Sequence, residues 1–241
     1  MGLGDGYLTA LGFLTRLGPA RSDPDMTACP AWFGAVGATL GFALTVPLAL
    51  GLLAGHPLAA AFLYAVANIA LTRGLHLDGF ADVADAWGSF ARGERFFAIM
   101  KDSRVGAFGG MALVVAVTGQ VALGAELLGA GRGWMLAVAP ALGRGFAVVL
   151  MHRCRDISRP GLGALFLSGA TTRAVLASLG LAVALGVVLV GLVATAWACL
   201  LGAGIIWGLG RLARTNGAIN GDFIGAAVVA VELAACLAGL L

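Results

Sequence analysis

The residues best suited to chemistry lie in one polar stretch of an otherwise apolar chain. Asp78, Asp82 and Asp85 follow one another at intervals of four and three residues. On a helix this spacing places the three carboxylates on one face, where they repel one another unless a cation neutralises them. Carboxylate oxygens suit Mg²⁺, which proteins often bind through one or two carboxylates plus substrate phosphates. The spacing predicts a metal site; the alternative is a solvated amphipathic helix whose other face is buried.

A short basic turn follows the acidic stretch. Lys101, Asp102, Ser103 and Arg104 stand just before Gly106, where a long apolar run begins. Cations beside the free amides of a helix N-terminus form a phosphate-binding environment. Phosphoryl transfer uses a metal on the phosphate oxygens, cations that absorb developing charge, and a carboxylate near the attacking hydroxyl. The acidic stretch and the basic turn together predict this type of reaction.

Four further side chains are candidates for a role at this site. Arg144 lies inside an apolar run, where it either extends its charge to the membrane surface or binds an anionic or amide-rich substrate. Asp222, at a glycine-rich entry to the last run, either caps a helix or adds a carboxylate to the acidic site. Glu232 lies ten residues further on, and we expect it to pair across helices or to stay protonated. His76, in the acidic stretch, is a candidate substrate-binding residue.

The composition indicates the environment in which these residues act. Charged residues make up 11% of the 241 residues, against about 25% in soluble domains. Hydrophobic residues make up 60%, and the mean hydropathy is +0.97. This composition excludes an ordinary soluble enzyme, a disordered chain, a coiled coil and a disulfide scaffold. The net charge of +3 reports membrane orientation and gives no indication of nucleic-acid binding.

The apolar runs predict the fold. A bilayer admits only helices or closed barrels, and the runs lack the alternation of barrel strands. We therefore expect an all-α polytopic membrane bundle of about seven transmembrane helices, forming a single domain over 1–241 with a cytoplasmic acidic segment at 74–105. Whether the fifth and sixth runs form separate helices stays open. The predicted runs are 32–54, 57–73, 106–129, 133–151, 174–194, 196–210 and 223–241.

The distribution of cations predicts the orientation. If seven spans alternate, thirteen of the fifteen Lys and Arg residues, Arg21 among them, fall on one side of the membrane. Arg132 alone falls on the other side. The positive-inside rule makes the basic side cytoplasmic, which places the N-terminus inside and the C-terminus outside.

Three sequence segments resemble the cobalamin synthase family, the adenosylcobinamide-GDP ribazoletransferases of the bacterial inner membrane. They are GLHLDGFADVAD at 74–85, IMKDSRVG at 99–106 and GDFIGA at 221–226, with Glu232 as further support. The chain departs from the family pattern in having Ala86 where glycine is usual and Ala98 where glutamate is common. It also lacks the threonine that usually precedes the Gly-Asp pair ending at Asp222. None of these departures removes a carboxylate from the acidic stretch.

The resemblance implies a Mg²⁺-dependent transferase in the bacterial inner (cytoplasmic) membrane with its site facing the cytoplasm. The 5′-hydroxyl of α-ribazole, or of its 5′-phosphate, would attack the cobinamide-side phosphorus of adenosylcobinamide-GDP, and GMP would leave. The partners are then these two substrates and the lipid bilayer, while a homo-oligomer and contacts with other enzymes of nucleotide-loop assembly stay open.

Each candidate residue has a role in this scheme. The metal ligands would be Asp78, Asp82 and Asp85. The phosphate oxygens would be bound by Lys101, Ser103 and Arg104. The candidate catalytic carboxylates are Asp82, Asp102 and Asp222, the last two near the attacking hydroxyl.

Two other functions fit parts of the sequence. Asp82 and Asp85, with Arg92 nearby, partly mimic the first acidic motif of the CDP-alcohol phosphotransferases, but only Asp102 stands where a second aspartate pair should follow. An ion-coupled transporter would also carry embedded acids, although transporter sites lie near the membrane midplane. The acidic stretch lies instead in a polar segment of some thirty residues.

Overall fold

The protein is a helical bundle in the computed structural model, which describes residues 3–19, 22, 24–159 and 162–241. Within these residues the extended structure is limited to an isolated parallel bridge between Ser158 and Ile219. Arg21 lies outside the described residues. The elements are α1 (Leu3–Leu14), the 3-10 helix η1 (Cys29–Trp32), α2 (Phe33–Ala49), α3 (Pro57–Thr72), α4 (Leu75–Gly88), α5 (Glu94–Met100), α6 (Ala107–Gly129), α7 (Trp134–Cys154), the 3-10 helix η2 (Arg155–Ile157), α8 (Leu162–Gly169), α9 (Thr172–Val190), α10 (Leu192–Thr215) and α11 (Gly221–Ala238).

Six segments of the described chain are long and apolar enough to cross a membrane. They are Cys29–Ala49, Ala107–Gly129, Trp134–Ile157, Thr172–Val190, Leu192–Thr215 and Gly221–Ala238. A seventh is obtained if α3 and α4, which meet at an angle of 90°, are counted as one broken span. Outward-facing side chains such as Val188, 79% exposed, are apolar, as lipid contact requires. The predicted all-α polytopic membrane fold is confirmed.

The fifth and sixth apolar runs form separate helices with boundaries that differ from those predicted. The predicted fifth run, 174–194, is interrupted at Gly191, whose φ of +89° is strained for any residue with a side chain. Helix α10 starts directly after this glycine and continues through Arg211 to Thr215. The predicted end at 210 was too early, because a basic last turn suits the negative end of a helix dipole.

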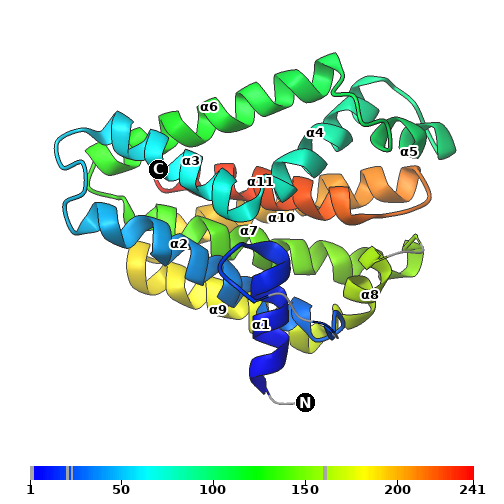
Figure 1. Ribbon diagram of the computed structural model, residues 1–241, viewed down its shortest axis with the longest axis horizontal. Helices are drawn as coiled ribbons and strands as arrows, with labels where there is room; N and C mark the ends of the chain where they lie inside the picture. The colour runs from blue at the N-terminus through cyan, green and yellow to red at the C-terminus, as the bar shows by residue number, and fades with distance from the viewer. Residues whose placement is uncertain (1–2, 20–21, 23, 160–161) are drawn as a thin grey trace.

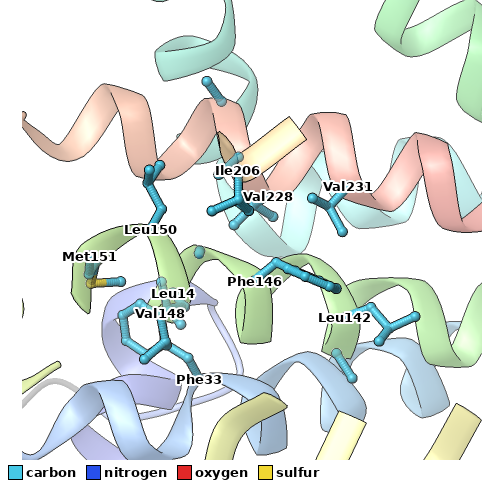
Figure 2. Packing of buried hydrophobic residues seen from close by; sticks show 14 of the residues in the cluster. Leu14, Phe33, Leu142, Phe146, Val148, Leu150, Met151, Ile206, Val228 and Val231 are labelled. Carbon is cyan, nitrogen blue, oxygen red and sulfur yellow. The ribbon is translucent and has the colours of Figure 1, made fainter. Parts of the chain in front are cut away.

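Helix α7 forms the centre of the bundle and packs against α2, α9, α10 and α11. Figure 2 shows its side chains Phe146 and Leu150 on the side of α10 and α11, close to Ile206 and Val228. A Cβ on Gly37 of α2 would lie 2.2 Å from the Pro140 carbonyl oxygen of α7, so only glycine permits this approach. Small residues at helix interfaces serve the same purpose in membrane proteins generally.

The basic connections gather at one end of the molecule. Successive spans run in alternating directions, so the ends of α7 and α10 and the starts of α6 and α11 lie at the same end, on the right in Figure 1, and α4 runs from the end of α3 towards it. The short helices α5 and α8 lie there too. The acidic stretch and the basic turn therefore share one end of the bundle.

Candidate active site

The 90° bend between α3 and α4 sets the acidic helix against α11 and α6. Arg73 and Gly74 both adopt left-handed backbone conformations, with φ of 59° and 67°. Arginine rarely adopts this conformation. Its guanidinium donates hydrogen bonds to the carbonyl oxygens of Phe13 (2.6 Å) and Gly12 (3.3 Å), which tie the junction to α1. Arg73, which was not among the candidate site residues, thus positions α4.

Close contact between α4 and α11 brings distant carboxylates together. A Cβ on Gly79 would lie 2.8 Å from the Asp222 Cα, so α4 lies directly against the start of α11. Asp82 is half-buried and is repelled by the charges of Asp222, Asp78 and Asp85. We call Asp78, Asp82 and Asp222 the acidic group. The structure thus places Asp222 beside α4, and its role as an added carboxylate of the site stays a prediction.

The alternative role of Asp222 as a helix cap does not hold. The capping position of α11 belongs to Asn220, and Asp222 is the second residue of the helix. The Asn220 side-chain amide donates a hydrogen bond to Asp222 Oδ2 at 2.7 Å. Its own oxygen, Oδ1, is buried and has no hydrogen-bond partner among the described residues. This unpartnered oxygen beside the acidic group was not identified from the sequence.

Asp85 has a different role from its two neighbours on α4. Its Oδ2 accepts a hydrogen bond from the Gly106 amide (2.8 Å), and its Oδ1 accepts one from the Gly109 amide (2.7 Å). Asp85 therefore caps the N-terminus of α6, where a carboxylate also interacts favourably with the helix dipole. These are the amides that the sequence suggested for phosphate binding, and a phosphate would have to compete with Asp85 for them.

The basic turn is exposed and adjoins the acidic group through Asp85. Lys101, Ser103 and Arg104 are all solvent-accessible, and the turn ends at Gly106, which is bound to Asp85. Arg104 pairs with Asp102 at 2.7 Å, and these hydrogen bonds lower the pKa of Asp102 to about 2. No described contact joins Asp102 to the acidic group. The geometry thus gives no support to its predicted place near the attacking hydroxyl.

The acidic group has donors of the kind that Mg²⁺ prefers. Among the described residues, no three His, Cys, Asp or Glu side chains converge closely enough to hold a metal ion without rearrangement. Asp82 nevertheless lies within reach of the charges of Asp78 and Asp222, and the unpartnered oxygen of Asn220 adjoins Asp222. Hard oxygen ligands with uncompensated negative charge are typical of magnesium sites. Because Asp85 is bound to the amides of Gly106 and Gly109, the carboxylates that stay free for a cation are Asp78, Asp82 and Asp222.

Arg144 lies in the interior, away from the surface of the site. Its side chain is 1% exposed and forms an ion pair with Glu232 of α11 at 2.9 Å, so the predicted pairing of Glu232 across helices is confirmed. Arg144 Nε is buried without a hydrogen-bond partner among the described residues. The pair borders a cavity of about 40 Å³ that the buried His76 also lines. Arg144 and His76 therefore line an interior cavity whose wall, among the described residues, includes none of the acidic group.

Residues that sequence reasoning missed hold the loops around the site. Asn216 accepts a hydrogen bond from the Gly93 amide at 3.0 Å, which links the end of α10 to the loop before α5. Arg159 pairs with Glu94, and its guanidinium lies 3.9 Å from the centre of the Phe97 ring. The only signal of these contacts in the sequence is the glycine- and asparagine-rich composition of segment 216–225.

Fold and site together define a polytopic helical membrane protein with an acidic group and an exposed basic turn at one end. The family model described as cobalamin-5-phosphate synthase matches residues 6–240. The chain therefore belongs to the cobalamin-5-phosphate synthase family and is an enzyme of cobalamin biosynthesis. This membership favours the resemblance over the phosphotransferase and transporter alternatives.

Curated relatives agree with this assignment over almost the whole chain. A protein of Nitratidesulfovibrio vulgaris (strain Miyazaki F) named adenosylcobinamide-GDP ribazoletransferase is 46% identical over 235 residues, which cover 95% of this chain and 92% of the relative. A protein of the same name from Klebsiella pneumoniae (strain 342) is 40% identical over 242 residues, covering 96% and 98%. No solved structure matches the chain.

Proposed function

We propose that the protein transfers α-ribazole, or its 5′-phosphate, to adenosylcobinamide-GDP and releases GMP. The names of the relatives support these substrates. The structural observation that carries the proposal is the convergence of Asp82 and Asp222, 140 positions apart in the chain, beside an exposed basic turn. A diphosphate could lie between the carboxylates and the cations at this end of the bundle.

In the proposed reaction one phosphorus–oxygen bond forms and another breaks. The 5′-oxygen of the ribazole bonds to the cobinamide-side phosphorus, and the bond from that phosphorus to the bridging oxygen breaks. GMP leaves with the bridging oxygen. The hydroxyl proton passes to Asp82, since taking up a proton removes one negative charge from a crowded acidic group. Asp222, whose charge acts on Asp82, orients the hydroxyl.

The remaining candidate residues would bind the diphosphate. Lys101 and Arg104 supply charge to the phosphate oxygens, and Ser103 supplies a hydroxyl donor. Mg²⁺, held by Asp78, Asp82 and Asp222 with Asn220 beside them, would neutralise the charge of the diphosphate. Asp85 holds the start of α6, and thereby the end of the basic turn, in place.

The test is GMP release by the purified protein in detergent. With adenosylcobinamide-GDP, α-ribazole and Mg²⁺ we expect steady release of GMP, and omission of α-ribazole should abolish it. Removal of divalent ions with EDTA should lower the rate at least about 100-fold, because the crowded carboxylates would then repel the diphosphate. Added Mg²⁺ should restore it. Release of a CDP-linked product, or GMP release that is unchanged in EDTA, would contradict the proposal.

We also propose that the acidic group faces the cytoplasm of a bacterial cell. The cations at that end of the bundle support this orientation. The C-terminus lies at the opposite end and should therefore be periplasmic. A phosphatase that is active only in the periplasm should be active when fused there, and a green fluorescent protein fused there should not fluoresce. Fluorescence of the C-terminal fusion would show that the C-terminus is cytoplasmic and would contradict the proposed orientation.

A further inference from the structure

Two spaces of different character meet at Asp78. The smaller has a volume of about 200 Å³ and lies among α1, α2, α7, α8 and the start of α11. We call it the aromatic cavity; its walls include Leu14, Phe33, Met151, Phe166, Asp78 and Asp222. The larger is an open groove of about 770 Å³ along Arg73, Asp78 and Val105. A reaction that joins two molecules needs two such spaces that meet at the reacting groups.

The aromatic cavity is lined by apolar side chains, among them three phenylalanine rings. The ring centre of Phe166 lies 4.6 Å from that of Phe13 and 5.9 Å from that of Phe33. Leu14 and Met151 complete the apolar wall, and Figure 2 shows them close to Phe33, where α1, α2 and α7 meet. Rings and a thioether favour contact with a flat aromatic ligand.

The polar residues of the aromatic cavity come from α4 and the start of α11. They are His76, Asp78 and Asp222, two of which belong to the acidic group. A ligand that fills the cavity must therefore be apolar at one end and must present its other end to the carboxylates. A lipid chain satisfies only the first condition.

We propose that the aromatic cavity binds the benzimidazole base of the ribazole substrate and so selects the nucleophile; this rests on the proposed function. Ribazole is a nucleoside whose base is a flat bicyclic ring, and its sugar carries the attacking 5′-hydroxyl. With the base among Phe33, Met151 and Phe166, the sugar lies beside Asp78 and Asp222. The corrin macrocycle is much too large for this cavity and would bind in the open groove.

A variant that fills the cavity tests this assignment. In Leu14→Trp a bulky ring occupies space needed by the base, so we expect the KM for α-ribazole to rise at least tenfold while the KM for adenosylcobinamide-GDP stays within twofold. Ala112→Leu is the matched control, because it adds bulk to a separate apolar groove between α4, α6 and α10. Both KM values should stay within twofold of the wild type in this control.

An enlarging variant gives a gain of function that mere destabilisation cannot produce. Leu14→Ala should raise kcat/KM for the riboside of naphthimidazole, a tricyclic base, at least fivefold relative to the wild type. Calorimetric binding of α-ribazole in the absence of the second substrate should be weakened tenfold in Leu14→Trp. Equal increases in both KM values, or unchanged binding, would overturn the assignment. If the wild type released no GMP, the proposed function would fail, whereas the binding measurement would still report on the cavity.

Discussion

Replacement of Asp82 by asparagine should reduce the rate of GMP release about 1,000-fold, within the range that a positioned general base contributes. Asparagine has nearly the same shape but cannot take the hydroxyl proton, and it weakens any magnesium site on the acidic group. Because the substitution also removes repulsion from Asp222 and Asp78, we expect the bundle to be no less stable. The measurement is kcat in detergent, with size-exclusion chromatography to verify folding.

Asp156→Asn is the matched control for this variant. Asp156 lies at the same end of the bundle, but its carboxylate pairs with the exposed Arg214 outside the acidic group. Exposed ion pairs contribute about 0–1 kcal/mol, so this variant should keep most of its activity. Activity of Asp82→Asn within tenfold of the control would contradict the role of Asp82.

The sequence was sufficient to predict the class of fold and most of the acidic group. An apolar run of about twenty residues is long enough to cross the membrane as a helix, and this holds whatever other helices it packs against. The spacing of Asp78 and Asp82 similarly places both on one helix face without any knowledge of tertiary contacts. These features depend on local periodicity and length, which a single sequence contains directly.

The partners of individual side chains could not be predicted in the same way. Asp85 has the same helical spacing as Asp82, yet it caps α6 because the amides of Gly106 and Gly109 happen to lie opposite it. Spacing shows which face a carboxylate is on, but not whether that face meets an ion, a helix end or water. Likewise, the contact between Gly79 and Asp222 arises from the packing of two helices far apart in the chain.

Loss of the Arg144 side chain should be the most destabilising single change in the interior. Arg144→Met leaves the Glu232 carboxylate buried without its cation, and breaking such a pair typically costs about 3–5 kcal/mol. We expect a large drop in thermal stability in detergent, measured by the temperature at which half of the protein remains monodisperse. Stability equal to that of the wild type would show that the pair does not hold α7 against α11.

The double variant Arg144→Met with Glu232→Gln separates a structural role of the pair from substrate binding. It removes both charges, and replacing a whole buried pair by neutral groups is often close to neutral for stability. Helix α11 carries Glu232 and, ten residues earlier, Asp222, so restored packing should return Asp222 to the acidic group and restore GMP release. If the double variant were stable but still inactive, the pair would act on the substrate, as the position of Arg144 in an apolar run first suggested.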